Sequence, residues 1–143
     1  ADVRSDLFVT IFYVVLDAFS AQLSFANAGH NPPLLVRAAR PASEYLTQHG
    51  MALGVMPNVT LTEQSLTLEA GDVLVLYTDG VTEALNEAGE EFGLERLERS
   101  VIDSLGGSPD DIVQEVKNAL RAYVGDEPPF DDMTMVVVKR VNG

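Results

Sequence analysis

Residues 73–80 read Val73-Leu74-Val75-Leu76-Tyr77-Thr78-Asp79-Gly80, an apolar run that ends on a carboxylate and a glycine. The run is short, continuous in hydrophobicity and rich in β-branched and aromatic residues, which predicts a buried strand. Gly71-Asp72 predicts a tight turn before it. Asp-Gly after a strand is most often a hairpin turn, yet residues 81–86 do not have the pattern of a return strand. The alternative is that Asp79 is a carboxylate held at the rigid end of a strand, where Gly80 lets backbone or ligand approach closely.

Further strands are expected on both sides of this stretch. Residues 7–16 are almost continuously apolar, which favours an inner strand covered on both faces. Residues 22–27 alternate between polar and apolar as a half-buried strand does, so a turn at 17–20 would join the two as a hairpin. Glycine and two prolines interrupt the pattern at 28–33. The expected strands cover residues 7–16, 22–27, 34–36, 61–68, 73–77 and 133–138, with short strands and loops between 38 and 58.

Two helices are expected before the last strand. Apolar residues recur at helical spacing over residues 94–105, and Gly106-Gly107 ends that pattern. Ser108-Pro109-Asp110-Asp111 has the composition of a helix start, with a serine cap, a proline in the first turn and two aspartates at the positive end of the helix dipole. The second helix would begin at Pro109, and its apolar face would comprise Ile112, Val113, Val116, Leu120 and Tyr123. Since strands dominate, the sequence predicts an α+β fold with antiparallel sheets, folded as a single domain over residues 1–143.

Composition limits the classes of function. The 143 residues contain 9 Lys and Arg against 22 Asp and Glu, and the net charge of −13 argues against nucleic acid or an anionic membrane surface as a partner. Cysteine is absent, which excludes thiolate zinc sites, cysteine nucleophiles and disulfide scaffolds. The longest apolar stretch, residues 7–16, is too short to span a bilayer, and the first residues do not resemble a signal peptide. We therefore expect a cytoplasmic domain with no membrane insertion, and the missing initiator Met predicts a fragment or a processed chain.

A second pair of candidate residues, Asp131 and Asp132, directly precedes the last expected strand. Adjacent carboxylates repel each other unless a cation or hydrogen-bond donors offset their charge. Together with Asp79 they would place carboxylates at two strand ends, which could converge and bind Mg²⁺ or Mn²⁺ through oxygen. The alternative is an ordinary polar turn after Pro128-Pro129.

Other polar residues have simpler interpretations. The lone His30, in a turn rich in glycine and proline, is more often a structural residue than an acid or base. The two histidines of the chain also argue against a multi-histidine metal centre. An acidic stretch is expected to be a solvated surface: Glu83, Glu87, Glu90 and Glu91.

Five phrases occur along the chain in a fixed order: Asp6-Leu7-Phe8-Val9-Thr10-Ile11-Phe12-Tyr13, Phe25-Ala26-Asn27-Ala28-Gly29-His30-Asn31-Pro32-Pro33-Leu34-Leu35, Leu76-Tyr77-Thr78-Asp79-Gly80-Val81-Thr82-Glu83-Ala84, Gly89-Glu90-Glu91-Phe92-Gly93 and Asp131-Asp132-Met133-Thr134. The ordered set resembles the SpoIIE/RsbU branch of the metal-dependent serine/threonine protein phosphatases, the PPM or protein phosphatase 2C-like family. A single phrase is weak, but the set covers nearly the whole chain and is specific.

The resemblance implies a fold, a reaction and a set of ligands. The fold would be two antiparallel β-sheets packed as a sandwich and flanked by helices. The reaction would be hydrolysis of protein phosphoserine or phosphothreonine by a water that bridges two Mn²⁺ or Mg²⁺ ions. By the same resemblance, Asp79 and Asp131 match metal ligands, and Gly80 and Asp132 would support them. The substrate would be a phosphorylated anti-anti-sigma protein in a bacterial partner-switching circuit, and the parent chain would carry sensor or response-regulator domains.

The chain departs from the family pattern near its start. The earlier metal-binding Asp and the Gly-His-Gly motif of the family lie upstream of the segment that begins near Asp6, and Gly29-His30 is a different motif. We therefore expect the chain to be the C-terminal part of the phosphatase domain, inactive by itself, with weak or no metal binding and with exposed sheet edges or a homodimer. Two alternatives stay open: a catalytically silent protein-binding module with the same fold, and an acidic structural domain with ordinary turns at Asp79 and Asp131.

Overall fold

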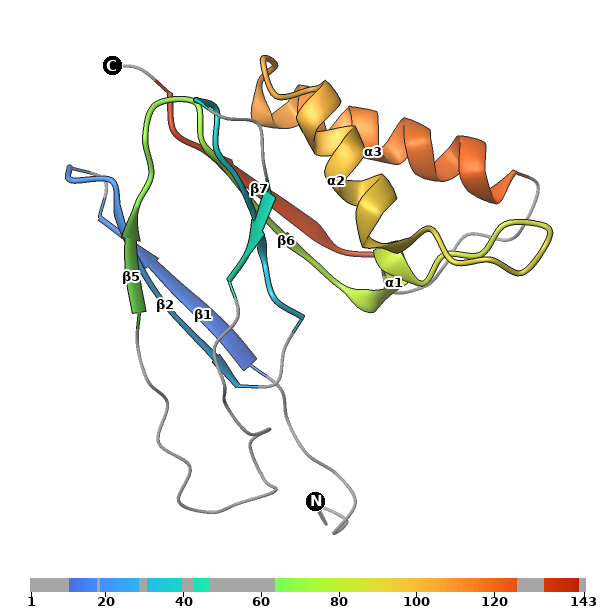
Figure 1. Ribbon diagram of the computed structural model, residues 1–143, viewed down its shortest axis with the longest axis horizontal. Helices are drawn as coiled ribbons and strands as arrows, with labels where there is room; N and C mark the ends of the chain where they lie inside the picture. The colour runs from blue at the N-terminus through green and yellow to red at the C-terminus, as the bar shows by residue number, and fades with distance from the viewer. Residues whose placement is uncertain are drawn as a thin grey trace, which may run out of the picture. The chain divides into compact units, whose positions relative to one another are not determined.

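The computed structural model describes residues 11–17, 19–28, 31–39, 43–46, 64–125 and 133–141. Along the chain, the elements are β1 (Ile11–Leu16), β2 (Gln22–Ala28), β3 (Leu34–Val36), β4 (Ser43–Tyr45), β5 (Gln64–Thr67), β6 (Val73–Tyr77), α1 (Asp79–Thr82), α2 (Gly93–Asp103), α3 (Pro109–Val124) and β7 (Met135–Lys139) (Figure 1). These bounds confirm most of the predicted strands and both predicted helices. Residues 7–10, 47–60 and 61–63 lie outside the described residues.

The chain divides into two compact units. The first comprises Ala1–Pro32 and Leu46–Leu68, and the second comprises Pro33–Tyr45 and Glu69–Gly143. Each unit has its own antiparallel sheet, with strand order β1-β2-β5 in the first and β4-β3-β6-β7 in the second. The predicted α+β fold with two antiparallel sheets and helices is therefore confirmed. That residues 1–143 act as one domain stays a prediction.

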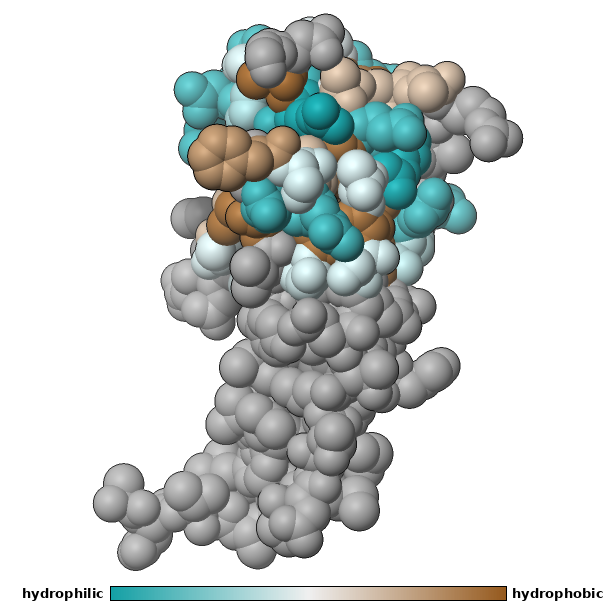
Figure 2. Space-filling view, turned by 90° about the vertical axis from the view of Figure 1, so that its left-hand side faces the viewer, coloured by the Kyte–Doolittle hydropathy of each residue, from teal (hydrophilic) through white to brown (hydrophobic). Residues whose placement is uncertain are grey.

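In the first unit, β1 and β2 form the predicted hairpin, with register from Ile11↔Ala28 to Leu16↔Leu23. The turn is held by the Asp17 carboxylate, which accepts hydrogen bonds from the N–H groups of Phe19 at 2.9 Å and Ser20 at 3.2 Å. These two bonds lower the pKa of Asp17 below its usual 3.8. Figure 2 shows hydrophobic and hydrophilic residues interspersed over the described part of the face that it draws.

One expectation about β1 is wrong for the described strands. The apolar run predicted an inner strand, but β1 lies at the end of its sheet and β2 occupies the middle, between β1 and β5. Hydrophobicity reports whether the faces of a strand are covered, whereas the number of hydrogen-bonded neighbours depends on pairing with distant segments.

The second unit is built around β6, which pairs with β3 on one side and β7 on the other. Figure 1 shows α2 and α3 lying side by side over one face of this sheet. Each helix contributes an apolar face at helical spacing. The core comprises residues from the strands, from the helices and from the segments that lead into them: Leu34, Val36, Val73, Val75, Tyr77, Val81, Ala84, Phe92, Leu97, Val101, Ile112, Val116, Leu120 and Val124.

Helix α3 begins as its sequence predicts. Ser108 is the N-cap, its hydroxyl accepts from the Asp111 N–H at 3.1 Å, and the Asp111 carboxylate accepts from the Ser108 N–H at 3.0 Å. This reciprocal pair is a capping box, and Pro109 follows it in the first turn. Lys139 on β7 donates from Nζ to the carbonyls of Leu105 at 2.9 Å and of Gly107, which ties the turn between the helices to the sheet. Within the described residues, no helix combines the length and the apolar character needed to cross a membrane.

Replacing Ser108 with Ala is expected to lower the free energy of unfolding by about 1 kcal/mol, because the Asp111 N–H loses its acceptor. Urea denaturation followed by circular dichroism measures this change. Ser108→Asp keeps an acceptor at the cap and is expected to retain most of the stability. An equal loss in both variants would contradict a capping role.

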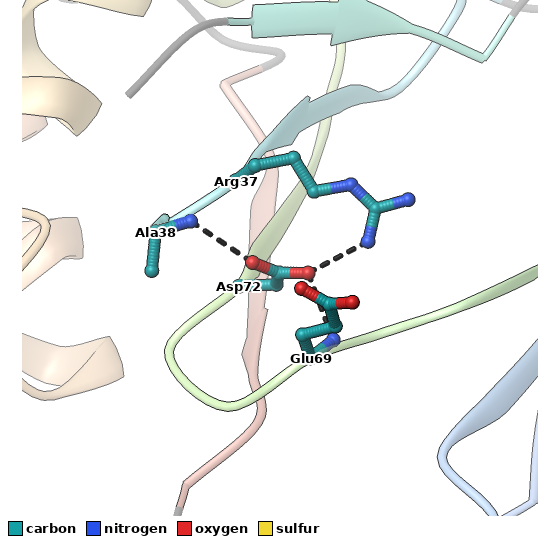
Figure 3. Close-up of polar contacts among 4 residues, drawn as sticks. All are labelled: Arg37, Ala38, Glu69 and Asp72. Atoms are coloured by element: carbon teal, nitrogen blue, oxygen red, sulfur yellow. Dashed lines mark hydrogen bonds and ion pairs between the residues drawn. The ribbon is translucent and has the colours of Figure 1, made fainter. Parts of the chain in front are cut away.

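Asp72, immediately before β6, is a buried carboxylate that the sequence indicated only as part of a turn. It is 1% exposed and accepts hydrogen bonds from Arg37 Nη1 at 2.7 Å, from the Ala38 N–H at 2.9 Å and from the Glu69 N–H at 2.8 Å (Figure 3). Its carbonyl accepts from the Arg140 N–H at 3.1 Å. Burial acts to raise the pKa of Asp72, but these hydrogen bonds and the Arg37 charge outweigh it and hold the pKa below the usual 3.8. Asp72 thus joins the segments after β3, before β6 and after β7 at one end of the sheet.

Candidate metal centre

The other end of β6 carries the predicted carboxylate. The chain leaves the strand through Thr78, whose backbone is extended, and enters the short helix α1. Two hydrogen bonds close this helical turn, from the Val81 N–H to the Thr78 carbonyl at 3.0 Å and from the Glu83 N–H to the Asp79 carbonyl at 2.8 Å. The side chain of Val81 is buried, whereas Asp79 is exposed. The hairpin interpretation is therefore wrong, and Asp79 lies at the end of a buried strand, on a turn anchored in the core.

Gly80 is the second residue of α1 and is partly exposed. This position places its backbone directly beside Asp79, so it belongs to the same surface. Its supporting role in a metal site stays a prediction.

Thr78 and Thr134 bring the two sequence motifs together. The β6–β7 register pairs Tyr77 with Met135, so that Thr78 and Thr134 face each other in the next pair. The Thr78 N–H donates to the Thr134 carbonyl at 3.0 Å, and the Thr134 N–H donates to the Thr78 hydroxyl at 3.0 Å. The segment that follows Asp131 therefore begins its strand against the residue that precedes Asp79. Asp131 and Asp132 themselves lie outside the described residues.

Tyr77 does not supply a base to this end of the sheet. Its side chain is 4% exposed, and burial, reinforced by the negative charge of Asp79, raises the pKa of Tyr77 to about 12. The phenol therefore stays protonated at neutral pH.

The oxygen ligands of this region are of the type that a hard cation binds. Asp79 offers carboxylate oxygens, the ligand type that Mg²⁺ prefers and that also suits Mn²⁺. Among the described residues, no three His, Cys, Asp or Glu side chains lie close enough to hold a metal ion. A full set of ligands would therefore require residues outside the described ranges, with Asp131 as the predicted partner of Asp79.

The remaining candidates contribute little to this site. His30 lies outside the described residues. The acidic side chains at positions 83, 87, 90 and 91 are exposed, as predicted for a solvated surface. The Asn86 carboxamide shapes their loop by accepting from the N–H groups of Ala88 at 3.0 Å and Glu90 at 2.9 Å.

Sequence reasoning gave no role to Thr78 and Thr134, which connect the two motifs. Two signals were present, since both threonines belong to the phrases that carry the family resemblance, and one directly follows a buried strand while the other directly precedes the last strand. Their contact spans 56 positions along the chain, so it becomes visible only with the strand pairing.

The fold is that of a PP2C-type phosphatase domain. The structure of the SiaA-PP2C domain of Pseudomonas aeruginosa superimposes with a TM-score of 0.71 over 91% of this chain and 51% of that chain, at 21% sequence identity. The family model for Stage II sporulation protein E (SpoIIE) matches residues 1–141, and the chain therefore belongs to the SpoIIE family. This confirms the predicted relation to the SpoIIE/RsbU branch.

Two relatives match along almost the whole chain. Protein IcfG of Synechocystis sp. is 35% identical over 134 residues, which are 94% of this chain and 21% of that protein. Phosphoserine phosphatase RsbU of Bacillus subtilis is 29% identical over 141 residues, which are 97% of this chain and 41% of that protein. The chain thus spans less than half the length of either relative.

Proposed function

We propose that the chain is part of a metal-dependent protein phosphatase that hydrolyses phosphoserine or phosphothreonine on a regulatory protein. The pairing of Thr78 with Thr134 is the observation that carries the proposal, because it joins the strand end bearing Asp79 to the segment that follows Asp131. The similarity to the phosphoserine phosphatase RsbU supports the same reaction.

In the proposed site, Asp79 and Asp131 hold the cations. Thr134 lies three positions after Asp131, and a chain of that length spans at most about 11 Å. The chain length therefore allows both carboxylates to reach one cluster of ions, since Thr134 is hydrogen-bonded to the neighbour of Asp79. Asp132 and Gly80 are proposed to support the ligands.

The charge of the chain explains why cations are needed. The chain carries a net charge of −13, and a phosphorylated protein presents a further anion. Carboxylates alone would repel the phosphate. Two Mn²⁺ or Mg²⁺ ions, when bound, would offset that repulsion and lower the pKa of an attacking water. The role of this chain is to hold Asp79 at a fixed point at the end of a rigid strand.

The partners are proposed from the same resemblance to the SpoIIE/RsbU branch. The substrate class is a phosphorylated protein of the anti-anti-sigma type in a cytoplasmic partner-switching circuit, with sensor or response-regulator domains in the parent chain. Nucleic acid is not proposed as a partner, since the net charge is unfavourable for binding it.

A catalytically silent binding module is the second candidate. The observation in its favour is that the described residues provide only part of a metal-ligand set. Such a module would bind the same protein partner without releasing phosphate.

Phosphate release from a phosphoserine protein by the full-length protein tests the proposal. Release is expected with added Mn²⁺, to stop with a chelator and to return when Mn²⁺ is restored. A phosphotyrosine peptide serves as the control substrate and is expected to stay intact. Binding of the phosphoprotein without any release would favour the silent module, and release that a chelator leaves unchanged would exclude the metal mechanism.

A further inference from the structure

The polar groups of Thr78 form hydrogen bonds with two different elements. Its carbonyl accepts from the Val81 N–H at 3.0 Å and so closes the first turn of α1. Its hydroxyl accepts from the Thr134 N–H at 3.0 Å, in the segment that begins β7. One residue therefore fixes the helical turn that carries Asp79 and also holds the start of the neighbouring strand.

The hydroxyl takes a place that a carbonyl normally fills. In an antiparallel sheet, a hydrogen-bonded pair of residues exchanges two N–H to carbonyl bonds. Here the Thr78 N–H donates to the Thr134 carbonyl at 3.0 Å, but the return bond from the Thr134 N–H ends on the Thr78 side chain. The hydroxyl thus continues the β6–β7 ladder by one bond at the point where the backbone of Thr78 turns into α1.

The same hydroxyl is not used as a helix cap. Thr78 is the N-cap residue of α1, where a threonine side chain ordinarily accepts from a backbone N–H in the first turn. No such side-chain bond is formed here. The oxygen also lies 3.4 Å from the Thr134 carbonyl, so both polar backbone groups of Thr134 face it. The side chain of Thr78 is therefore committed to β7 instead of to its own helix.

We propose that the Thr78 hydroxyl is a positioning group of the metal centre, which holds the segment after Asp131 in register with the strand end that carries Asp79. The inference rests on the proposed function of the two aspartates. Thr78 acts in this scheme through the Thr134 N–H that its oxygen accepts, as a positioning residue and not as a ligand. The bond is solvent-accessible, so its removal affects local order at this strand end more than overall stability.

Three variants of the full-length protein separate this role from a general effect on the fold. Thr78→Val keeps the branched shape and removes the acceptor, whereas Thr78→Ser keeps the acceptor. Thr82→Val is the matched control, because Thr82 is the last residue of the short helix that Thr78 precedes and is partly exposed in the same way. Thermal unfolding without metal checks that all the proteins are folded.

The first measurement is hydrogen exchange of the Thr134 amide in metal-free protein. Thr78→Val is expected to accelerate this exchange by roughly two- to tenfold, the range that corresponds to one hydrogen bond. Thr78→Ser and Thr82→Val are expected to stay close to the wild type. An unchanged exchange rate in Thr78→Val would show that the hydroxyl does not hold this segment.

The second measurement is the affinity for Mn²⁺ by calorimetric titration. Thr78→Val is expected to bind Mn²⁺ roughly tenfold more weakly, as loss of a group that orients metal ligands does. Thr78→Ser is expected to bind within about twofold of the wild type. Equal affinity in Thr78→Val and wild type, equal weakening in Thr78→Ser and Thr78→Val, or no uptake of Mn²⁺ by the wild type would each overturn the inference.

A different result would contradict the proposed function. A wild-type protein that binds Mn²⁺ but releases no phosphate from a phosphoserine protein would contradict the phosphatase assignment. The inference about Thr78 would still be decided by the Mn²⁺ affinities of the two Thr78 variants.

Discussion

Asp79→Asn is expected to lower phosphate release by the full-length protein at least about a hundredfold, more than the loss of a group that only orients a ligand. The amide has almost the shape of the carboxylate but lacks its negative charge, so a divalent cation loses its strongest interaction at the end of β6. Asp79 is exposed, so the change in the free energy of unfolding is expected to stay within about 0.5 kcal/mol. The measurement is kcat/KM on a phosphoserine protein at a series of Mn²⁺ concentrations.

Glu83→Gln is the matched control for this variant. Glu83 is an exposed acidic residue at the C-terminal end of the same short helix, and its substitution removes the same charge. Its activity is expected to stay within about twofold of the wild type, since exposed surface substitutions change little. Asp131→Asn is expected to behave like Asp79→Asn. Activity that survives both aspartate substitutions would show that their assignment as metal ligands is wrong.

The parts of the fold that the sequence predicts are those set by neighbouring residues. Ser108 and Asp111 form their capping box within one turn, and the apolar run at 73–77 is buried as predicted. The Asp17 turn likewise lies between the two strands that it joins. In each case, the stabilising contacts are made over a few positions, so the local pattern contains the information.

The parts that the sequence does not predict depend on pairing between distant segments. Among the described strands, β1 has β2 as its only hydrogen-bonded neighbour, and the burial of Asp72 follows from the approach of Arg37, 35 positions away. A hydrophobic pattern gives the faces of a strand but not its neighbours. The same limit applies to the candidate site, since Asp79 can be located from its place after a strand, but its relation to the second motif requires the β6–β7 register.

The two ends of β6 are held by different chemistry. At its start, the buried Asp72 joins three segments, two through its carboxylate and the segment after β7 through its backbone carbonyl. At its end, backbone hydrogen bonds close the exposed turn at Asp79, and the Thr78 hydroxyl adds one solvent-accessible bond to the start of β7. We therefore expect substitutions at the start of the strand to affect stability and substitutions at its end to affect metal binding.

Asp72→Asn is expected to lower the free energy of unfolding by about 2 kcal/mol, because the buried side chain loses the charge that its hydrogen-bond donors and the partly exposed Arg37 stabilise. Arg37 and Glu69 donate to one oxygen of Asp72 and Ala38 donates to the other, so the amide NH2 of an asparagine would face either the Ala38 N–H or the donors of Arg37 and Glu69. Urea denaturation followed by circular dichroism measures the change. Asp103→Asn, an exposed aspartate on α2, is the control and is expected to cost less than about 0.5 kcal/mol.

The loss in Asp72→Asn is also expected to depend on pH. The pKa of Asp72 is below 3.8 in the folded protein, where hydrogen bonds outweigh burial, and returns to its usual value on unfolding. As the pH falls, the unfolded chain therefore takes up the proton first, so the stabilisation is complete well above pH 3.8 and is lost as the pH falls below 3.8 through the folded pKa. The stability difference between wild type and Asp72→Asn should thus be largest near about pH 7 and shrink near about pH 3. A difference that stays constant over this range would show that the charge of Asp72 does not stabilise the start of β6.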